Sequence, residues 1–578
     1  MTAQPFSPDR TTDVVDLRDA PLVDPTVPAT PSALDLELDL RDGGPDTHHD
    51  PAGGAVRHAV HGHRFGALLT ATLAGLTSRV DALICAVLVL VTTVVNSVGL
   101  FAFPSLADDE GTYVAQAMAV RGGELTHYTF WYDHPPLGWI QLGMLDWLPQ
   151  LLLPGVQPVA ASRVIVVLAA GVSAWLMYVL GRRLGIRRAF AALAVLVAFA
   201  SPLGITMHRQ VYLDNIAVPW LLLSFVLVLD RRQRLWSYVV AGLAFAIAVS
   251  TKETTVVLAP VLLWIIFSHG NRRTRTFSLA GFLGTSALVG YYPLMALLRG
   301  ELFPGAGHVS LVDALNFQLL HRPGSGAMWE VGSSSHTVLL SWLYYDPWVV
   351  VLGLVGLPVT LAVRRLRPLG LALLLVVLVA LKPGGYLPAM YVIVALPLLG
   401  LAVGAVGDVA WTGVRRLAAR AGAAPGRAIR GGAGILVVAA ATVLAVAWAP
   451  GLADVMSQRT NDARTEAEAW AARNLPAGST VLTDDVTWVS LVRNGTVDRD
   501  RAIWFYKLDT DPEVSARLAG GWRDVDYVVS TDQMRGSLAG DPTLSQSSAA
   551  MRNSELVARF GAGESAVEIR RVLAGDVR

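Results

Sequence analysis

Three adjacent carboxylates, Asp108, Asp109 and Glu110, follow directly after the first long apolar run of the chain. Carboxylates crowded beside an apolar surface repel one another and lose solvation, which raises the proton affinity of at least one of them and suits it to act as a general base. Asp is also a good helix cap, and acids favour the first turn of a helix, so an acidic helix start is an equal alternative. The chemistry alone leaves both interpretations open.

Asp133 and His134 form a second polar group, and Pro135 and Pro136 follow them directly. The two prolines restrict the backbone and thereby fix where both side chains point. An Asp–His pair can bind a phosphate, a metal or a sugar hydroxyl. A solvated turn is the alternative, and the segment by itself favours it.

The elements that must position these groups are membrane spans. The chain has 578 residues, of which 53% are hydrophobic and 16% charged, and its mean hydropathy is +0.48. This composition excludes an ordinary soluble protein, and the formal net charge of +1 gives no basic footprint for nucleic acid. Apolar runs of about 20 residues can each cross a hydrocarbon core of about 30 Å. We predict an α-helical polytopic membrane protein with about eleven spans, near residues 82–103, 160–181, 188–206, 212–230, 236–251, 254–268, 277–298, 337–363, 368–382, 386–411 and 432–450.

Arginine clusters give the predicted orientation, because short cytoplasmic loops carry the excess of positive charge. Every second loop is basic, and Arg57, Arg64 and Arg79 precede the first span. The chain is therefore expected in the plasma membrane with a cytoplasmic N-terminus, and the odd number of spans places the C-terminus outside. The basic loops contain residues 182–188, 231–234, 272–275, 364–367 and 415–430.

Lysine is rare in this chain, with three residues among 46 Lys and Arg. Lys252 and Lys382 both fall at the predicted outer ends of spans, on the same face as the carboxylates. A cation at this edge of the bilayer is a good candidate for binding a lipid-linked phosphate. Snorkelling of the side chain to the interface is the alternative.

The chain divides by composition into three parts. Residues 1–78 have the composition of a disordered cytoplasmic tail. Residues 79–451 form the transmembrane domain, and amphipathic stretches in its outer loop, residues 104–159, predict helices that lie in the interface plane. Residues 452–578 are polar and predict a small extracytoplasmic α/β domain, with a helix at 462–474 and strands at 479–482, 526–530 and 566–572. Asp484 and Asp485 are assigned to a solvated turn.

The combination of these motifs resembles the first loop of the protein O-mannosyltransferase and aminoarabinose-transferase group. Asp109, Glu110 and Tyr113 stand just after the first span, and His-Pro-Pro-Leu-Gly follows at 134–138. The likeness covers roughly residues 80–410. It continues with Arg209-Gln-Val-Tyr212-Leu-Asp214, Thr251-Lys252-Glu253 and Lys382-Pro-Gly-Gly-Tyr386-Leu-Pro388.

The resemblance implies a GT-C type membrane glycosyltransferase that uses a polyprenyl-phosphate sugar. Asp109 would be the catalytic base that deprotonates the acceptor hydroxyl, and Glu110 would orient or tune it. The remaining matching positions would bind the phosphate or the sugar of the donor; they are Asp133, His134, Arg209, Asp214, Lys252, Lys382 and Tyr386. His134 stands where some related enzymes have Lys, and the resemblance leaves a divalent metal open.

The predicted reaction moves a hexosyl or pentosyl unit to an envelope glycan, lipid or protein at the outer membrane face, with inversion at the anomeric carbon. A transporter or flippase of lipid-linked sugars is one alternative; it predicts an internal repeat and charges near the middle of the membrane. The sequence has no evident duplication, and its candidate polar residues gather on one side. A non-catalytic membrane scaffold is the other alternative, for which Asp109 would be dispensable.

Overall fold

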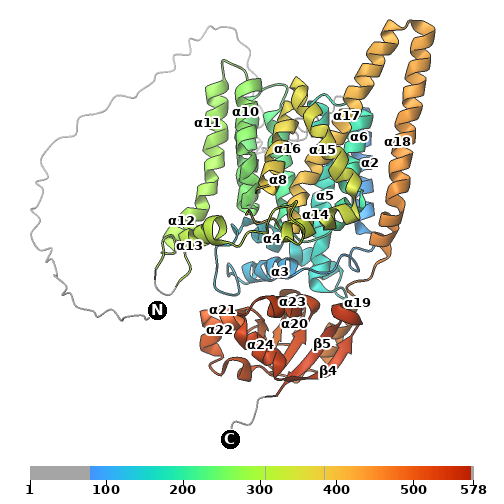
Figure 1. Ribbon diagram of the computed structural model, residues 1–578. Coiled ribbons are helices and arrows are strands. Elements are labelled where there is room, and N and C mark those ends of the chain that lie inside the picture. Colours follow the sequence, from blue (N-terminus) through green and yellow to red (C-terminus); the bar gives the residue numbers. More distant parts are fainter. Residues whose placement is uncertain (1–78, 306–307, 383, 574–578) are drawn as a thin grey trace, which may run out of the picture. The chain divides into compact units, whose positions relative to one another are not determined.

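Long apolar helices make up most of the computed structural model, which describes residues 79–305, 308–382 and 384–573 (Figure 1). The predicted tail, residues 1–78, lies outside the described residues. The first helices in chain order are α2 (Arg79–Ser97), α3 (Asp108–Arg121), α4 (Leu137–Leu152), α5 (Pro158–Arg183), α6 (Arg188–Phe199), α7 (Pro202–His208), α8 (Leu213–Val228), α9 (Leu235–Thr251), η1 (Glu253–Leu258), α10 (Ala259–His269), α11 (Arg275–Ser286), η2 (Ala287–Gly290) and α12 (Tyr291–Leu298).

A second group of helices completes the apolar part of the chain. Five helices of the described residues are long and apolar enough to cross a membrane, or up to seven if each of two bent pairs is one span. The chain is thus a multi-pass membrane protein, whereas the predicted count of eleven spans is not confirmed. The second group comprises α13 (Leu311–Asn316), η3 (Phe317–His321), α14 (Ser334–Tyr345), α15 (Pro347–Ala362), η4 (Arg364–Leu366), α16 (Arg367–Ala380), η5 (Ala389–Tyr391), α17 (Val392–Arg420) and α18 (Ala423–Ser457).

Two predicted spans are interrupted. The segment predicted as one span at 337–363 consists of α14 and α15, which meet at 106°. Asp346 and Pro347 explain the bend, because proline cannot continue the hydrogen bonds of α14 and the Asp346 carboxylate accepts from the N–H groups of Trp348 and Val349 to start α15. The segment 188–206 is likewise divided into α6 and α7, at 61°.

Ion pairs gather the basic loops at one end of the spans. Asp81, at the start of α2, pairs with Arg182 and Arg188, at 3.1 and 2.7 Å. Asp408 in α17 pairs with Arg187 at 2.8 Å and also with Arg365. Two buried carboxylates thereby hold four arginines of the basic loops 182–188 and 364–367, and Asp408 joins these two loops.

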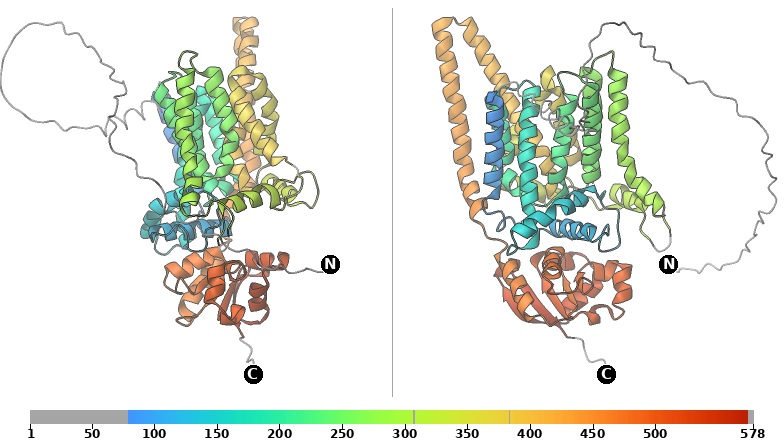
Figure 2. Two further views of the ribbon diagram at one scale, coloured as in Figure 1. Left: turned by 90° about the vertical axis from the view of Figure 1, so that its left-hand side faces the viewer. Right: turned by 180° about the vertical axis from the view of Figure 1, so that it is seen from behind.

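The last apolar helix, α18, packs against α17 but leaves nearly all of its surface open. Of its 35 residues only Gly426 and Val455 are buried. Figure 1 and the right-hand view of Figure 2 show the two helices as a long hairpin. Because the exposed side chains of α18 are mostly aliphatic, its surface suits contact with lipid chains.

The C-terminal α/β region, residues 462–573, contains a five-stranded sheet in the order β2-β1-β3-β5-β4. β1 pairs in parallel with β2 and β3, and β5 pairs antiparallel with β3 and β4. Its elements are α19 (Asp462–Asn474), β1 (Val481–Thr483), α20 (Asp485–Arg493), β2 (Ala502–Trp504), α21 (Lys507–Thr510), α22 (Pro512–Arg517), η6 (Gly521–Asp524), β3 (Tyr527–Ser530), α23 (Asp532–Gly540), α24 (Ser545–Arg552), β4 (Ser554–Phe560), η7 (Gly563–Ser565) and β5 (Val567–Val572).

The sheet presents the carboxyl ends of its parallel strands to α3. Asp485 follows β1, and Tyr506 and Lys507 follow β2. Gly111 in α3 lies so close to α20 that a Cβ atom there would stand 2.4 Å from the backbone nitrogen of Val486. Only glycine allows this contact, which brings the start of α3 against the start of α20.

Candidate active site

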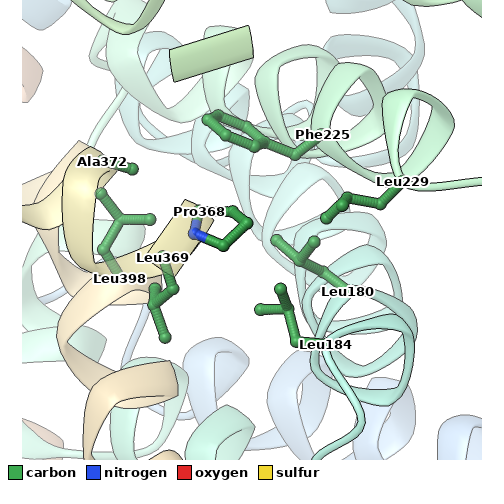
Figure 3. A pocket seen from close by; sticks show the side chains of 8 residues that line it. All are labelled: Leu180, Leu184, Phe225, Leu229, Pro368, Leu369, Ala372 and Leu398. Atoms are coloured by element: carbon green, nitrogen blue, oxygen red, sulfur yellow. The ribbon is translucent and has the colours of Figure 1, made fainter. Parts of the chain in front are cut away.

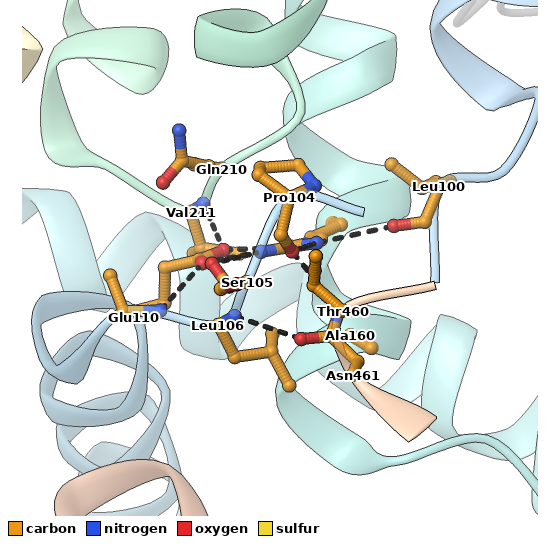
Figure 4. A network of polar contacts seen from close by, with 12 residues as sticks. Leu100, Pro104, Ser105, Leu106, Glu110, Ala160, Gln210, Val211, Thr460 and Asn461 are labelled. Carbon is orange, nitrogen blue, oxygen red and sulfur yellow. Dashed lines mark hydrogen bonds and ion pairs between the residues drawn. The ribbon is translucent and has the colours of Figure 1, made fainter. Parts of the chain in front are cut away.

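Asp109 lies in the first turn of α3 and is partly exposed. Its neighbour Glu110 is fully buried, and the Oε2 and Oε1 atoms of Glu110 accept from Nε of Arg163 at 2.9 Å and from its second guanidinium nitrogen at 2.6 Å. Oε2 also accepts from the backbone N–H of Val211 at 2.8 Å. Figure 4 shows this network. Asp109 is therefore accessible to a substrate, whereas the carboxylate of Glu110 is used in an ion pair that stabilises the fold.

Arg163 extends the network to the chain segment before α3. It donates to the carbonyl oxygens of Leu100 at 3.2 Å and Pro104 at 2.8 Å (Figure 4). Asn461, just before α19, donates to Pro104 O and accepts from the N–H of Leu106. These bonds fix the turn that leads into α3 and therefore fix where Asp109 stands.

Lys252, His134 and Glu253 form a hydrogen-bonded chain across two distant segments. Nζ of Lys252 lies 3.1 Å from Nε2 of His134, and Nδ1 of His134 lies 3.0 Å from Oε2 of Glu253. The ammonium can only donate, so Nε2 accepts and Nδ1–H donates to the carboxylate; a neutral imidazole satisfies both contacts. The sequence predicted Lys252 and His134 as ligands of the donor but did not predict that they touch, and it did not single out Glu253.

Tyr113 connects this chain with Asp109. Its ring centroid lies 6.2 Å from that of His134. Burial, and then the charges of Asp109, Asp214 and Glu253, raise the pKa of Tyr113 well above its usual value. Asp214, at the start of α8, is buried and interacts with the charges of Lys252 and Glu253. Asp109, Asp214, Glu253 and His134 therefore all lie near one buried tyrosine.

The other predicted ligands have no hydrogen bond to the Lys252–His134–Glu253 chain among the described residues. Arg209 is fully buried. Its guanidinium donates to the carbonyl oxygens of Val455, Val95 and Val98 and thereby joins neighbouring helices. Lys382 and Tyr386 are exposed in the loop after α16. Arg322, which the sequence analysis missed, stacks on the ring of Tyr386 with its Cζ 3.4 Å from the centroid, and it interacts with the charge of Asp133. Asp133 itself is exposed.

A buried acid cluster joins α3 to the C-terminal α/β region. Oδ2 of Asp485 accepts from the hydroxyl of Thr112 and, at 2.9 Å, from that of Tyr506. Asp484 caps α20 and pairs with Arg464 at 2.6 Å. Both aspartates are buried, so their assignment to a solvated turn was wrong. Their partners lie far away in sequence or in the preceding helix, which is why the local pattern resembled a turn.

The carboxyl groups of this cluster differ, because Arg464 keeps the pKa of Asp484 below its usual value whereas the pKa values of Asp108 and Asp485 are raised. Burial, and then the charges of Asp484 and Asp485, raise the pKa of Asp108 to about 9. Burial raises the pKa of Asp485 to about 7, although hydrogen bonds from Thr112 and Tyr506 act in the opposite direction. The sequence predicted a raised proton affinity from crowding among the three adjacent acids, whereas at Asp108 the main causes are burial and the charges of two distant residues, Asp484 and Asp485.

Two further features of the described residues bear on the site: the arrangement of possible metal ligands and an apolar pocket. Within residues 79–305, 308–382 and 384–573, no group of three or more His, Cys, Asp or Glu side chains is arranged to hold a metal ion. An apolar pocket lies between α5, α8, α16 and α17, toward the end of α5 that carries Arg182 (Figure 3). It is lined by Leu180, Leu184, Phe225, Leu229, Pro368, Leu369, Ala372 and Leu398.

The arrangement of the helices is similar to that of GT-C type membrane proteins. Residues 133–296 match the family model described as dolichyl-phosphate-mannose-protein mannosyltransferase. The structure is similar to ArnT from Cupriavidus metallidurans bound to undecaprenyl phosphate, with a TM-score of 0.53 and 16% identity over 84% of this chain and 98% of that chain. ArnT in the apo state gives a TM-score of 0.52 and 16% identity over 84% and 97%. No curated protein sequence matches the chain.

These matches confirm the resemblance to the protein O-mannosyltransferase and aminoarabinose-transferase group. The family model begins at Asp133 and includes His134, Asp214 and Lys252, so it covers the segments that form the Lys252–His134–Glu253 chain. The similarity to ArnT extends over a larger part of the chain and shows a shared fold.

Proposed function

We propose that this protein is a glycosyltransferase that moves a hexosyl or pentosyl unit from a polyprenyl phosphate to an acceptor at the outer face of the plasma membrane. The observation that carries the proposal is the placement of Asp109. It is a partly exposed carboxylate at a fixed helix start, and the ring of Tyr113 in the same helix lies 6.2 Å, between centroids, from that of His134 in the Lys252–His134–Glu253 chain. This arrangement offers a base and a cation for one displacement reaction.

The proposed reaction is a direct displacement. Asp109 accepts the proton of an acceptor hydroxyl, the hydroxyl oxygen forms a bond to the anomeric carbon, and the bond from that carbon to the phosphate oxygen breaks. The electron pair leaves with polyprenyl phosphate, and the proton stays on Asp109. Attack opposite the leaving group inverts the anomeric centre. A phosphate leaving group needs charge neutralisation more than protonation, which Lys252 supplies and Lys382 assists.

His134 and Glu253 have supporting roles in this proposal. The neutral imidazole accepts from Lys252 and thereby orients its ammonium, and Glu253 fixes the tautomer. Asp214 contributes charge beside Lys252, whereas the carbonyl contacts of Arg209 favour a structural role. Asp133, Arg322 and Tyr386 would contact the sugar or the acceptor from the exposed side.

The proposed topology follows from the arginine clusters. The tail, residues 1–78, would be cytoplasmic, residues 79–451 would cross the membrane about eleven times, and residues 452–578 would form an extracytoplasmic domain. ArnT was solved with undecaprenyl phosphate, which supports a polyprenyl-phosphate donor for this chain. The acceptor would be an envelope glycan, lipid or protein.

The first test is sugar transfer in membranes that contain the wild type, Asp109→Asn or the control Asp532→Asn. Asp532 is an exposed acid of the C-terminal α/β region. With a set of radiolabelled polyprenyl-phosphate monosaccharides, we expect one donor to support transfer by the wild type and the control, and Asp109→Asn to lose at least about 100-fold in rate because a general base contributes that much. Equal transfer by all three proteins would refute the role of Asp109, and no transfer from any donor would favour a transporter or a scaffold.

A further inference from the structure

Lys507 is buried between the C-terminal α/β region and the outer loop. It begins α21, directly beyond the carboxyl end of β2, and is 6% exposed. Its Nζ lies 5.0 Å from the ring centroid of Trp131 and 5.6 Å from those of Tyr128 and Tyr506. Two of these three rings come from the segment between α3 and α4, so the cage is completed by parts of the chain that are far apart in sequence.

The three aromatic rings around Lys507 leave its ammonium group without a conventional hydrogen-bond acceptor. Its ion-pair partner, Oδ2 of Asp511, lies 3.8 Å away, which exceeds hydrogen-bond distance, and Asp511 already accepts from the N–H groups of Thr129 and Glu513. Within the described part of the chain Nζ donates no hydrogen bond. An ammonium has three N–H donors, and these remain available to a ligand or to water.

A second donor without a partner lies beside the first. The indole Nε1 of Trp131 is buried and has no hydrogen-bond partner among the described residues. The Asp133 carboxylate, two residues further on, is exposed and interacts with the charge of Lys507. Two free donors, an exposed acceptor and aromatic faces therefore meet at one place.

The charges around Lys507 indicate which ligand suits these groups. Asp133, Asp485 and Asp511 all interact with the ammonium and offset its charge. An anionic ligand would gain little attraction here and would be repelled by the carboxylates. A neutral ligand with hydroxyl groups could accept from Lys507 and Trp131, donate to Asp133 and lay a ring against the aromatic side chains.

We propose that Lys507, Trp131 and Asp133 bind a neutral sugar unit of the acceptor, so that the C-terminal α/β region selects glycan acceptors. This inference rests on the proposed function, since it names the acceptor class of that reaction. The carboxyl edge of a parallel sheet, where Lys507 stands, is a common place for ligand binding in α/β folds. The subsite would hold the acceptor chain on the side of α3 that faces the sheet.

The test measures binding to the purified full chain in lipid nanodiscs by isothermal titration calorimetry. The probes are neutral hexose and pentose tetrasaccharides, the same saccharides carrying a phosphate, and a peptide rich in Ser and Thr. The variants are Lys507→Met, Trp131→Phe and the control Arg523→Met, in which an exposed arginine that stacks on Trp522 is replaced in the same region. Donor hydrolysis, the transfer of the sugar to water, is measured for each protein.

We expect a neutral saccharide to bind the wild type and Arg523→Met equally, and Lys507→Met to weaken binding at least tenfold. Trp131→Phe keeps a ring but removes the N–H, so a smaller loss of two- to fivefold is expected, and donor hydrolysis should be unchanged in all variants. The inference is overturned if no neutral saccharide binds, if the phosphorylated saccharide or the peptide binds better, or if both substitutions leave binding unchanged. Saccharide binding without sugar transfer from any polyprenyl-phosphate donor would refute the proposed function alone.

Discussion

Two neighbouring acids of α3 have opposite environments. Glu110 is enclosed by Arg163 and a backbone N–H, whereas Asp109, one residue earlier, is partly exposed. A buried carboxylate that loses its charge leaves the facing guanidinium unpaired in a medium of low dielectric constant. The two residues are therefore expected to respond differently to neutral substitution.

Glu110→Gln should lower the free energy of unfolding by roughly 3 kcal/mol or more, because it leaves the charge of Arg163 buried without a counterion. Asp109→Asn should leave stability close to that of the wild type. Thermal unfolding of the purified proteins in detergent, followed by circular dichroism, checks this difference. Equal melting temperatures for Glu110→Gln and the wild type would show that the buried pair contributes little.

Residue types and spacing predicted which side chains to examine but not how they pair. Lys252 and His134 are separated by 118 residues, and Glu110 and Arg163 by 53. Such contacts depend on how the spans pack, which no local pattern contains. Glu253 was part of the motif Thr251-Lys252-Glu253 but was given no role, whereas Arg322 and Lys507 had no local signal beyond the rarity of lysine.

At the scale of elements, the contact of α3 with α20 determines how the C-terminal α/β region meets the outer loop. Gly111 brings the helix starts together, and this places Asp108 near Asp484 and Asp485. Three acids at one contact cannot all be ionised without mutual repulsion. The contact should therefore depend on pH.

The raised pKa of Asp108 determines whether the stability of the protein rises or falls with pH. Its pKa is about 9 in the folded protein, against an ordinary value of 3.8. Between these values the folded state binds one more proton than the unfolded state, so its contribution to stability is complete below about pH 4 and is lost as the pH rises through 9. Asp108→Asn should flatten the decline in melting temperature between about pH 5 and about pH 9 by at least about 2 °C.

Melting curves over this pH range compare Asp108→Asn with the wild type. The control Asp532→Asn, an exposed acid, should keep the wild-type decline. A decline in Asp108→Asn as steep as that of the wild type would mean that the carboxyl group is ionised in the folded protein.

Hydropathy and amphipathic periodicity predicted most elements, because both are local properties. Helices occur at 108–121, 137–152 and 462–474, and strands overlap the three predicted in the C-terminal α/β region. β2 has only three residues, Ala502–Trp504, and β4 contains a bulge after Leu556, so neither gives a clear alternation. The bend between α14 and α15 had a local signal in Asp346-Pro347, which the long apolar run obscured.

At the scale of the whole molecule, the chemistry is segregated between the ends of the spans. Asp81 and Asp408 hold loop arginines at one end, while Asp109, His134 and Lys252 stand among the loops of the other. In the proposed orientation, the end with Asp81 and Asp408 faces the cytoplasm. This can be tested because the single cysteine of the chain, Cys85, is buried.

Arg552→Cys and Arg427→Cys each add one exposed thiol, the first in α24 and the second near the start of α18. We expect a membrane-impermeant maleimide to label Arg552→Cys in intact cells and to label Arg427→Cys only after permeabilisation. The wild type should stay unlabelled in both conditions. Labelling of Arg427→Cys in intact cells would reverse the proposed orientation.

The absent side chain at Gly111 limits how such a protein can be re-engineered. A backbone nitrogen of α20 occupies the place where any other residue would put a carbon atom. A chimaera that carries a C-terminal region from another protein would therefore need a helix start at the same spot, whatever the rest of its sheet looked like. New acceptor preferences are more easily introduced by exchanging the strand-end loops that contain Lys507, with the pairing of the two helices left intact.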